Sequence, residues 1–229
     1  MKLLLTSNGL SNDSIAKAFQ ELIGKNPKDS KVAFIPTAAN PERGSKDWLI
    51  DDLYRIKSRG YIVDIIELTA LKSEEVKKIL EGTDAIFVGG GNSFYLSYWM
   101  QKTGLFELLP ELLKTKVYAG ISAGSIVAGS NLLSSKAIKD GYIDEHYQEM
   151  STKDEGLDRA LGFVKIIFRP HLNSEHFPMV TEENLAKIVP QLAHPMYALD
   201  DESALKIVDG KIEVISEGKW LLLNKTRVK

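Results

Sequence analysis

The sequence contains no cysteine among its 229 residues. This absence excludes thiol nucleophiles, thiolate zinc sites, iron–sulfur clusters and disulfide bonds. Any covalent catalysis must therefore use the side chain of serine, threonine, lysine or histidine, or a carboxylate.

The chain also lacks an excess of positive charge and long apolar runs. It carries 29 Lys and Arg against 31 Asp and Glu, a net charge of −2, whereas a nucleic-acid-binding surface needs a basic face. The apolar run Leu3-Leu4-Leu5 stops at the polar residues 6–9, too early for an export signal, and no other stretch is long enough to span a membrane. We expect a cytoplasmic protein with no nucleic-acid partner and no membrane partner.

Short apolar runs recur along the chain and alternate with amphipathic segments. Four of them, bounded by Gly, Pro, Asp or Lys, predict strands at 32–36, 62–66, 85–88 and 117–121. Their continuous apolar character predicts burial on both faces, as in a parallel sheet covered by helices. The sequence therefore predicts one α/β domain of three layers that covers residues 1–229.

The segments between these runs predict helices. The first contains Ile15 and ends before Gly24, with Ser11 or Asn12 as its N-cap, and two more lie near 47–58 and at 73–81, the last capped by Ser73. Residues 131–160 lose this periodicity and predict an excursion from the sheet. Segments 204–208 and 212–215, joined by Asp209-Gly210, predict a C-terminal β-hairpin.

The segment 117–128 is the most informative in the chain. A buried strand leads directly into Gly120-Ile121-Ser122-Ala123-Gly124, and a run of small helix-forming residues follows. This Gly-x-Ser-x-Gly pattern, between a strand and a helix, is typical of a turn that exposes a nucleophilic serine above a sheet. The N–H of Ala123 would be available to a developing oxyanion.

A second glycine-rich segment also follows a buried strand. Gly89-Gly90-Gly91-Asn92-Ser93 matches neither the dinucleotide-binding pattern nor the P-loop, but its amides are suited to binding an oxyanion. Because parallel strands end at the same edge of a sheet, Gly90 and Gly91 are expected to face Ser122. This pairing suggests acyl transfer.

A nucleophilic serine needs a base, and the chain offers four histidines. His171 follows the strand-like run 165–170, which could deliver it to the same sheet edge, and is preferred over His176. His146 lies in the charged excursion and His194 in an apparent loop.

The segment from His171 to His176 is one residue longer than an inverted zinc motif. Pro170 and Pro178 disfavour the helix that would align such ligands. We therefore expect no metal ion and no other cofactor.

The acidic run Asp200-Asp201-Glu202, which follows an apolar strand, could supply the acid that orients the histidine. Three adjacent carboxylates are also typical of a solvated turn. A chain order of serine, histidine, acid differs from the order in α/β-hydrolases, which Asp140 or Asp158 together with His194 would restore.

Taken together, these segments resemble peptidase family S51, the serine peptidases that include aspartyl dipeptidase and cyanophycinase. The residues that carry the resemblance are Val88-Gly89-Gly90-Gly91-Asn92-Ser93-Phe94, Gly120-Ile121-Ser122-Ala123-Gly124, Pro170-His171 and Leu199-Asp200-Asp201. The resemblance implies a mostly parallel, flavodoxin-like α/β/α sheet related to the class I glutamine amidotransferases.

The resemblance also implies roles for individual residues. Ser122 would be the nucleophile and His171 the base, and Gly90, Gly91 and Ala123 would bind the oxyanion. Asp201 aligns with the catalytic acid of cyanophycinase-like members, with Glu202 and Asp140 as alternatives.

The resemblance implies a short peptide as substrate, hydrolysed by a monomer or homodimer. In aspartyl dipeptidase the segment after the histidine contains an arginine that is expected to bind the acidic side chain. The corresponding segment here, 172–178, has none, and Arg159 and Arg169 are the nearest candidates, so strict aspartyl specificity is not expected. A small-ester hydrolase and an inactive binding module of the same fold are the alternative functions.

Overall fold

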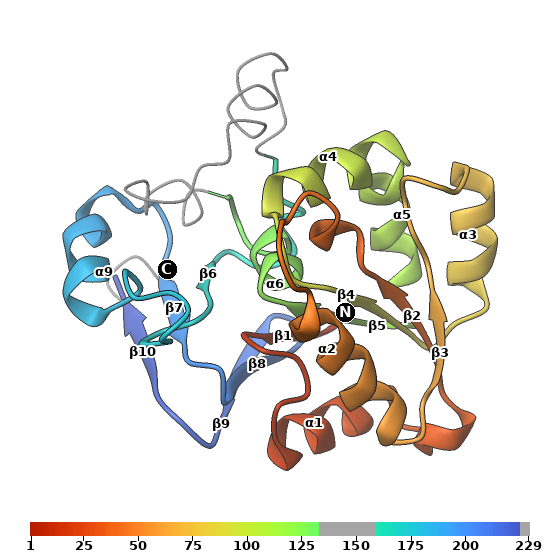
Figure 1. The fold of residues 1–229 in the computed structure, drawn as a ribbon, viewed down its shortest axis with the longest axis horizontal. Helices are drawn as coiled ribbons and strands as arrows, with labels where there is room; N and C mark the ends of the chain where they lie inside the picture. Colours follow the sequence, from red (N-terminus) through yellow and green to blue (C-terminus); the bar gives the residue numbers. More distant parts are fainter. Residues whose placement is uncertain (133–158, 225–229) are drawn as a thin grey trace.

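A computed structural model describes residues 1–132 and 159–224 of the chain (Figure 1). Its main sheet has seven strands in the order β3-β2-β4-β5-β1-β8-β9. In that order the strands are β3 (Ile62–Ile65), β2 (Lys31–Ile35), β4 (Ala85–Val88), β5 (Val117–Ile121), β1 (Lys2–Thr6), β8 (Ser203–Val208) and β9 (Lys211–Ser216). The first five strands are mutually parallel, and β8 pairs antiparallel with both β1 and β9. The predicted mostly parallel sheet is therefore confirmed.

The register of the parallel strands brings three chain segments to one edge of the sheet. Thr6 at the end of β1 pairs with Ile121 at the end of β5, and Val88 at the end of β4 pairs with Gly120. The residues that follow these ends, including Ser7, Ser122 and the glycine segment 89–91, therefore emerge side by side.

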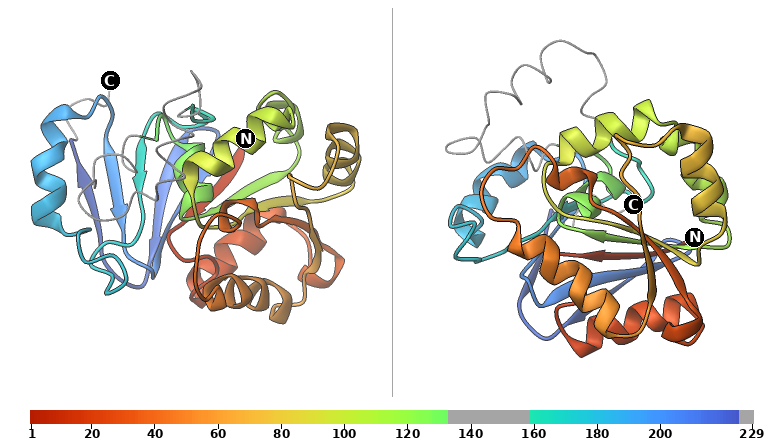
Figure 2. Two further views of the ribbon diagram at one scale, coloured as in Figure 1. Left: turned by 45° about the horizontal axis from the view of Figure 1, so that its top comes forward. Right: turned by 45° about the vertical axis from the view of Figure 1, so that its right-hand side comes forward.

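Helices cover both faces of the main sheet, as the two views in Figure 2 show. Apolar side chains of α1 (Asp13–Ile23) and α2 (Asp47–Ser58) pack on one face. The other face is covered by α3 (Ser73–Glu81), α4 (Ser93–Lys102), α5 (Leu105–Leu112) and α6 (Ala123–Ala128). Two short 3-10 turns, Pro27–Asp29 and Thr37–Ala39, flank β2. None of the helices in the described ranges is long and apolar enough to cross a bilayer.

A second, smaller sheet was not predicted. It contains β10 (Trp220–Leu223), β7 (Met196–Leu199) and β6 (Ile167–Arg169), in that order, and α9 (Glu182–Ile188) with the 3-10 turn Val189–Gln191 packs against it around a separate small core. The predicted strand-like run 165–170 contains β6, which pairs with β7 in this small sheet and not with a strand of the main sheet. The predicted excursion at 131–160 falls mostly outside the described residues.

The ends of the predicted helices are close to those observed. Asn12 caps α1 by accepting a hydrogen bond from the N–H of Ile15, and Gly24 ends the helix with φ 74°. Helix α3 has Lys72 at the N-cap position, so Ser73 is its first residue instead of its cap. Asp209 and Gly210 connect β8 to β9, both with positive φ.

The expectation of full burial was wrong for β3. Ile62 and Ile65 are 47% and 56% exposed. The strand lies at the edge of the sheet, and only its β2 side is paired, so its apolar composition does not lead to burial.

A carboxylate of α2 is buried beside the loop after β1. Asp52 is only 3% exposed, and its Oδ1 has no hydrogen-bond partner among the described residues. Arg55 lies 4.0 Å from that oxygen and donates a hydrogen bond to the Asn8 carbonyl. Burial raises the pKa of Asp52 to about 7, although the positive charge of Arg55 opposes the rise.

This pKa gives the stability of the protein a predictable pH dependence. Because the folded-state pKa of Asp52 lies above its unfolded value, its protonated form stabilises the fold at low pH, and that contribution is lost as the pH rises to about 7. The free energy of unfolding should fall by about 1–3 kcal/mol between pH 5 and pH 8, and Asp52→Asn should remove this part of the fall. Urea unfolding at several pH values measures it. The exposed Asp64→Asn serves as control, and an unchanged pH slope in Asp52→Asn would contradict the assignment.

Candidate active site

Ser122 stands on a sharp turn between β5 and α6. Its backbone adopts φ 46° and ψ −104°, a conformation that residues with side chains rarely adopt. Its N–H donates to the Thr6 carbonyl at 3.0 Å, and its carbonyl accepts the first hydrogen bonds of α6. The turn leaves the side chain of Ser122 partly exposed while both of its neighbours are buried.

The two glycines of the serine motif allow this turn to form. A Cβ on Gly120 would lie 2.6 Å from the backbone of Gly124, and one on Gly124 would lie 2.2 Å from the Val88 carbonyl oxygen. Both distances are far below van der Waals contact. The glycine spacing of the motif is therefore a packing requirement, because β4, β5 and α6 approach one another too closely for side chains.

His171 reaches Ser122 from the loop after β6. Its Nε2 lies 2.9 Å from Ser122 Oγ, and its Nδ1 lies 2.7 Å from Asp201 Oδ1. The ring also stacks on Phe177, with 4.2 Å between the ring centroids and 9° between the planes. Both ring nitrogens are thus engaged, and the stacked phenyl ring limits rotation of the imidazole.

Asp201 lies in the turn between β7 and β8 and is held in its charged form. Burial alone would raise the pKa of its carboxyl group, but hydrogen bonds with His171, Ser7 and Ser174 outweigh burial and lower the pKa below its ordinary value. A charged Asp201 accepts the Nδ1–H of His171, which leaves Nε2 free to accept a proton from Ser122.

The three adjacent carboxylates have different positions. Asp200 accepts hydrogen bonds from Ser203 Oγ and the Glu202 N–H, within the turn that leads to β8. Glu202 accepts a hydrogen bond from Asn12 at the surface. Among the three, Asp201 is the one in contact with His171, whereas Asp140 lies outside the described residues.

The remaining histidines are elsewhere or not described. Within residues 1–132 and 159–224, His171 is the histidine that contacts Ser122 and Asp201, and His176 is exposed. His146 and Asp158 fall outside these ranges. No group of three His, Asp or Glu side chains within them is arranged to hold a metal ion.

The glycine segment after β4 faces Ser122, as its position at the sheet edge predicted. A Cβ on Gly90 would lie 3.5 Å from Ser122 Cβ. Gly91 has φ 126°, and a Cβ there would lie 2.2 Å from the Ala38 carbonyl oxygen. No described residue accepts a hydrogen bond from the N–H of Gly90 or Gly91. Ala123, as the first residue of α6, also has a backbone N–H without an acceptor inside the helix.

Two residues close to the site were not identified from the sequence. Ser7 contacts both Asp201 and His171, and the ring of Trp48 lies 3.7 Å from the Cβ position of Gly90. Ser7 follows directly after β1, so its place at a strand's carboxyl end was the available signal. Trp48 is brought to the site by α2, and nothing in its local sequence indicates this.

The two arginines considered for substrate binding are engaged in packing. Arg159 lies over the ring of Phe106, with its guanidinium carbon 5.2 Å from the centroid. Arg169 is 8% exposed, and burial lowers its pKa to about 10.

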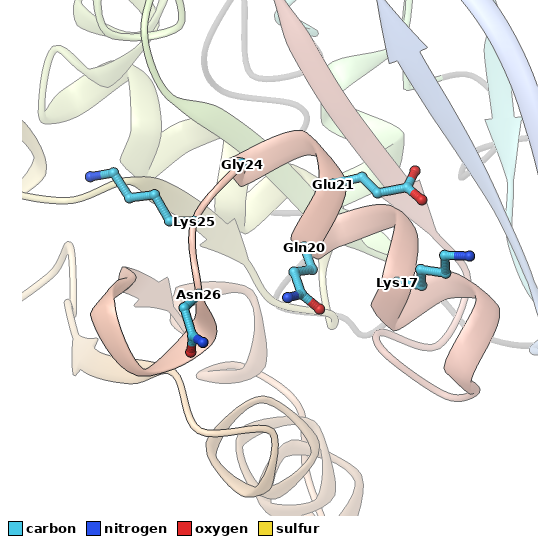
Figure 3. Close-up of a pocket in the computed structure, with 6 residues that line it drawn as sticks. All are labelled: Lys17, Gln20, Glu21, Gly24, Lys25 and Asn26. Atoms are coloured by element: carbon cyan, nitrogen blue, oxygen red, sulfur yellow. The ribbon is translucent and has the colours of Figure 1, made fainter.

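A shallow hollow on the surface lies away from this site (Figure 3). It is lined by Lys17, Gln20, Glu21, Gly24, Lys25 and Asn26. These residues lie in the second half of α1 and in the loop that follows it, close to where Lys2 at the start of β1 donates to the Leu22 carbonyl. The hollow is therefore at the amino edge of the sheet, whereas Ser122 is at the carboxyl edge.

An α/β sheet that presents a serine on a strained turn, hydrogen-bonded to a histidine and through it to a carboxylate, defines the class of serine hydrolases. Comparison with known sequences gives the family: the chain belongs to peptidase family S51, whose sequence model matches residues 3–215. The protein is therefore a peptidase.

Individual relatives agree with this assignment. The chain is 27% identical over 193 residues to the uncharacterized peptidase PM1590 of Pasteurella multocida (strain Pm70), covering 83% of this chain and 86% of the relative. It is 27% identical over 217 residues to peptidase E of Streptomyces coelicolor, covering 90% and 81%. A solved peptidase E-type structure from Listeria monocytogenes EGD-e superposes with a TM-score of 0.77 at 25% identity, covering 95% of this chain and 98% of that one.

The close approach at the serine turn predicts the effect of a single methyl group. Gly124→Ala should push α6 away from β4 and lower the free energy of unfolding by about 1–3 kcal/mol, as overpacking of a core does. Thermal unfolding measures the loss. Gly82→Ala is the control, because its Cβ would lie 3.4 Å from the nearest atom. Equal stability of the two variants would contradict the packing argument.

Proposed function

We propose that this protein is a serine peptidase that hydrolyses short peptides, with Ser122 as nucleophile, His171 as general base and acid, and Asp201 as the orienting carboxylate. The observation that carries the proposal is the position of the His171 ring, whose two nitrogens lie 2.9 Å from Ser122 Oγ and 2.7 Å from Asp201 Oδ1. These are distances at which a proton can move along a hydrogen bond.

The proposed reaction begins with proton transfer from Ser122 to Nε2 of His171 as Oγ attacks the scissile carbonyl carbon. Asp201 keeps the Nδ1 proton in place and stabilises the imidazolium that forms. His171 then gives its proton to the leaving amine, and an ester forms between the substrate's acyl group and Ser122. A water molecule, deprotonated by the same nitrogen, hydrolyses this ester and releases Ser122.

The negative charge on the carbonyl oxygen during attack requires hydrogen-bond donors. The amides of Gly90, Gly91 and Ala123 are proposed to supply them. Gly90 and Ala123 lie beside Ser122, Gly91 follows Gly90, and none of the three amides is used in the described hydrogen bonds. Each such donor contributes on the order of 10²–10³ to the rate in serine hydrolases.

The substrate is proposed to be a short peptide without a strict requirement for aspartate. The segment 172–178 that follows His171 contains no arginine, and its Phe177 stacks on the imidazole. The guanidinium of Arg159 lies over the ring of Phe106.

Ser122→Ala tests the nucleophile. It should lower kcat for dipeptide hydrolysis on the order of 10⁴-fold or more, because the remaining groups cannot form the acyl–enzyme ester. A fluorophosphonate probe should label the wild-type protein at one equivalent and leave the variant unlabelled. Ser14→Ala, an exposed serine of α1, is the control. Undiminished turnover in Ser122→Ala would overturn the proposal. Labelling of the wild-type protein by the probe, together with hydrolysis of esters but not of peptides, would favour an esterase.

A dipeptide panel tests the specificity. Peptides that begin with Asp, Ala, Leu and Gly should be cleaved with kcat/KM values within roughly tenfold of one another, because the segment 172–178 after His171 contains no arginine to favour an acidic side chain. Competition between pairs of dipeptides, followed by mass spectrometry, measures the ratios directly. Cleavage restricted to Asp-containing peptides would refute this part of the proposal.

A further inference from the structure

Ser7 forms a closed set of hydrogen bonds with the two residues proposed to activate Ser122. Its Oγ accepts a hydrogen bond from the backbone N–H of His171 at 2.8 Å and donates to Asp201 Oδ1 at 2.7 Å. The same carboxylate oxygen lies 2.7 Å from His171 Nδ1. The Ser7 hydroxyl therefore connects the backbone N–H of His171 to Asp201, the residue that also bonds the imidazole of His171.

The direction of these bonds follows from proton counting. A serine hydroxyl has one proton, and a charged carboxylate can only accept. With the Nδ1 proton of His171 directed at Asp201, the 3.4 Å separation between Ser7 Oγ and Nδ1 is not used for donation, and the Ser7 proton goes to Asp201. This arrangement selects the tautomer that leaves Nε2 unprotonated opposite Ser122.

The backbone of His171 gives Ser7 a second effect. His171 has φ 64°, in the left-handed region that a β-carbon makes unfavourable. The hydrogen bond from its N–H to Ser7 Oγ helps to hold this conformation. Without it, relaxation of the backbone would turn the imidazole away from Ser122.

Thr6, the residue before Ser7, contacts the serine turn itself. Its carbonyl accepts hydrogen bonds from the Ser122 N–H and from Ser125 Oγ, at 3.0 and 2.8 Å. Its hydroxyl donates to the Gly120 carbonyl at 2.7 Å. Thr6 and Ser7 are both fully buried, so these bonds are shielded from competing water.

We infer that Ser7 is a positioning residue for the peptidase reaction: through its hydroxyl it aligns His171 and Asp201 with the serine turn that Thr6 fixes. The inference rests on the proposed roles of Ser122, His171 and Asp201. On this inference, the residues at the end of β1 align two parts of the fold, because Ser122 follows β5 of the main sheet and His171 follows β6 of the small sheet.

Ser7→Ala should lower kcat by on the order of 10- to 100-fold, the effect of one hydrogen bond to a charged group. KM should change by less than about twofold, because Ser7 is not placed to touch the substrate. Ser30→Ala, which removes another fully buried hydroxyl that bonds a main-chain carbonyl far from the site, should leave both constants unchanged. Thermal unfolding of both variants separates a loss of folded protein from a loss of rate per folded molecule.

A double-mutant cycle with Asp201→Asn shows whether Ser7 acts through Asp201. In that background Ser7→Ala should cost several-fold less in kcat than in the wild type, because the charged acceptor is already gone. Fully additive effects would overturn the inference, as would wild-type kcat in Ser7→Ala.

Proton NMR of the His171 imidazole gives a readout that does not depend on turnover. The Nδ1 proton shared with Asp201 should give a downfield resonance in the wild type that shifts or broadens in Ser7→Ala and stays unchanged in Ser30→Ala. An unchanged resonance in Ser7→Ala would contradict the positioning role. Ser122→Ala distinguishes a failure of the proposed function. Retained turnover in that variant would refute Ser122 as the nucleophile, whereas the His171 resonance and its response to Ser7→Ala could still be measured.

Discussion

The approach of α6 to the ends of β4 and β5 is the constraint on which the site depends. The main chain of Gly124 lies so close to the Val88 carbonyl that no side chain fits between them. This contact fixes the first turn of α6 and forces Ser122 into a conformation with positive φ. Such strain persists only where the surroundings determine it, and here the packing of a buried sheet does so. Ser122, the proposed nucleophile, is thereby positioned by main-chain packing alone.

The partners of Ser122 come from a different part of the fold. His171 follows β6 of the small sheet, and Asp201 lies where the chain passes from β7 of that sheet to β8 of the main one. The relative placement of the two sheets therefore decides whether the imidazole reaches Ser122. The hydrogen bonds on Asp201 offset the cost of its burial and lower its pKa, so the charge proposed to orient His171 also connects the two sheets.

Local patterns in the sequence predicted the features that depend on neighbouring residues. The α1 caps, four parallel strands and the glycines around Ser122 follow from side-chain size and periodicity over a few positions. The exposure of β3 and the separate small sheet do not, because they depend on which strands pair, and apolar runs look alike at an edge and in the centre. Ser7 was missed for the same reason: its role appears only when residues 164 positions away are brought to it.

The chemistry of a hydroxyl nucleophile explains why so much structure surrounds one serine. A free thiol is a few per cent ionised at neutral pH, whereas a serine hydroxyl is essentially un-ionised and cannot attack without a base of the correct tautomer. The chain has no cysteine, so the proposed reaction requires that His171 keep its proton on Nδ1. A carboxylate that stays charged, because Ser7 and Ser174 donate to it in addition to His171, accepts the Nδ1 proton throughout the physiological pH range. In the proposed reaction, the hydrogen-bond donors around Asp201 therefore keep it charged, and the charged Asp201 allows His171 to accept the proton of Ser122.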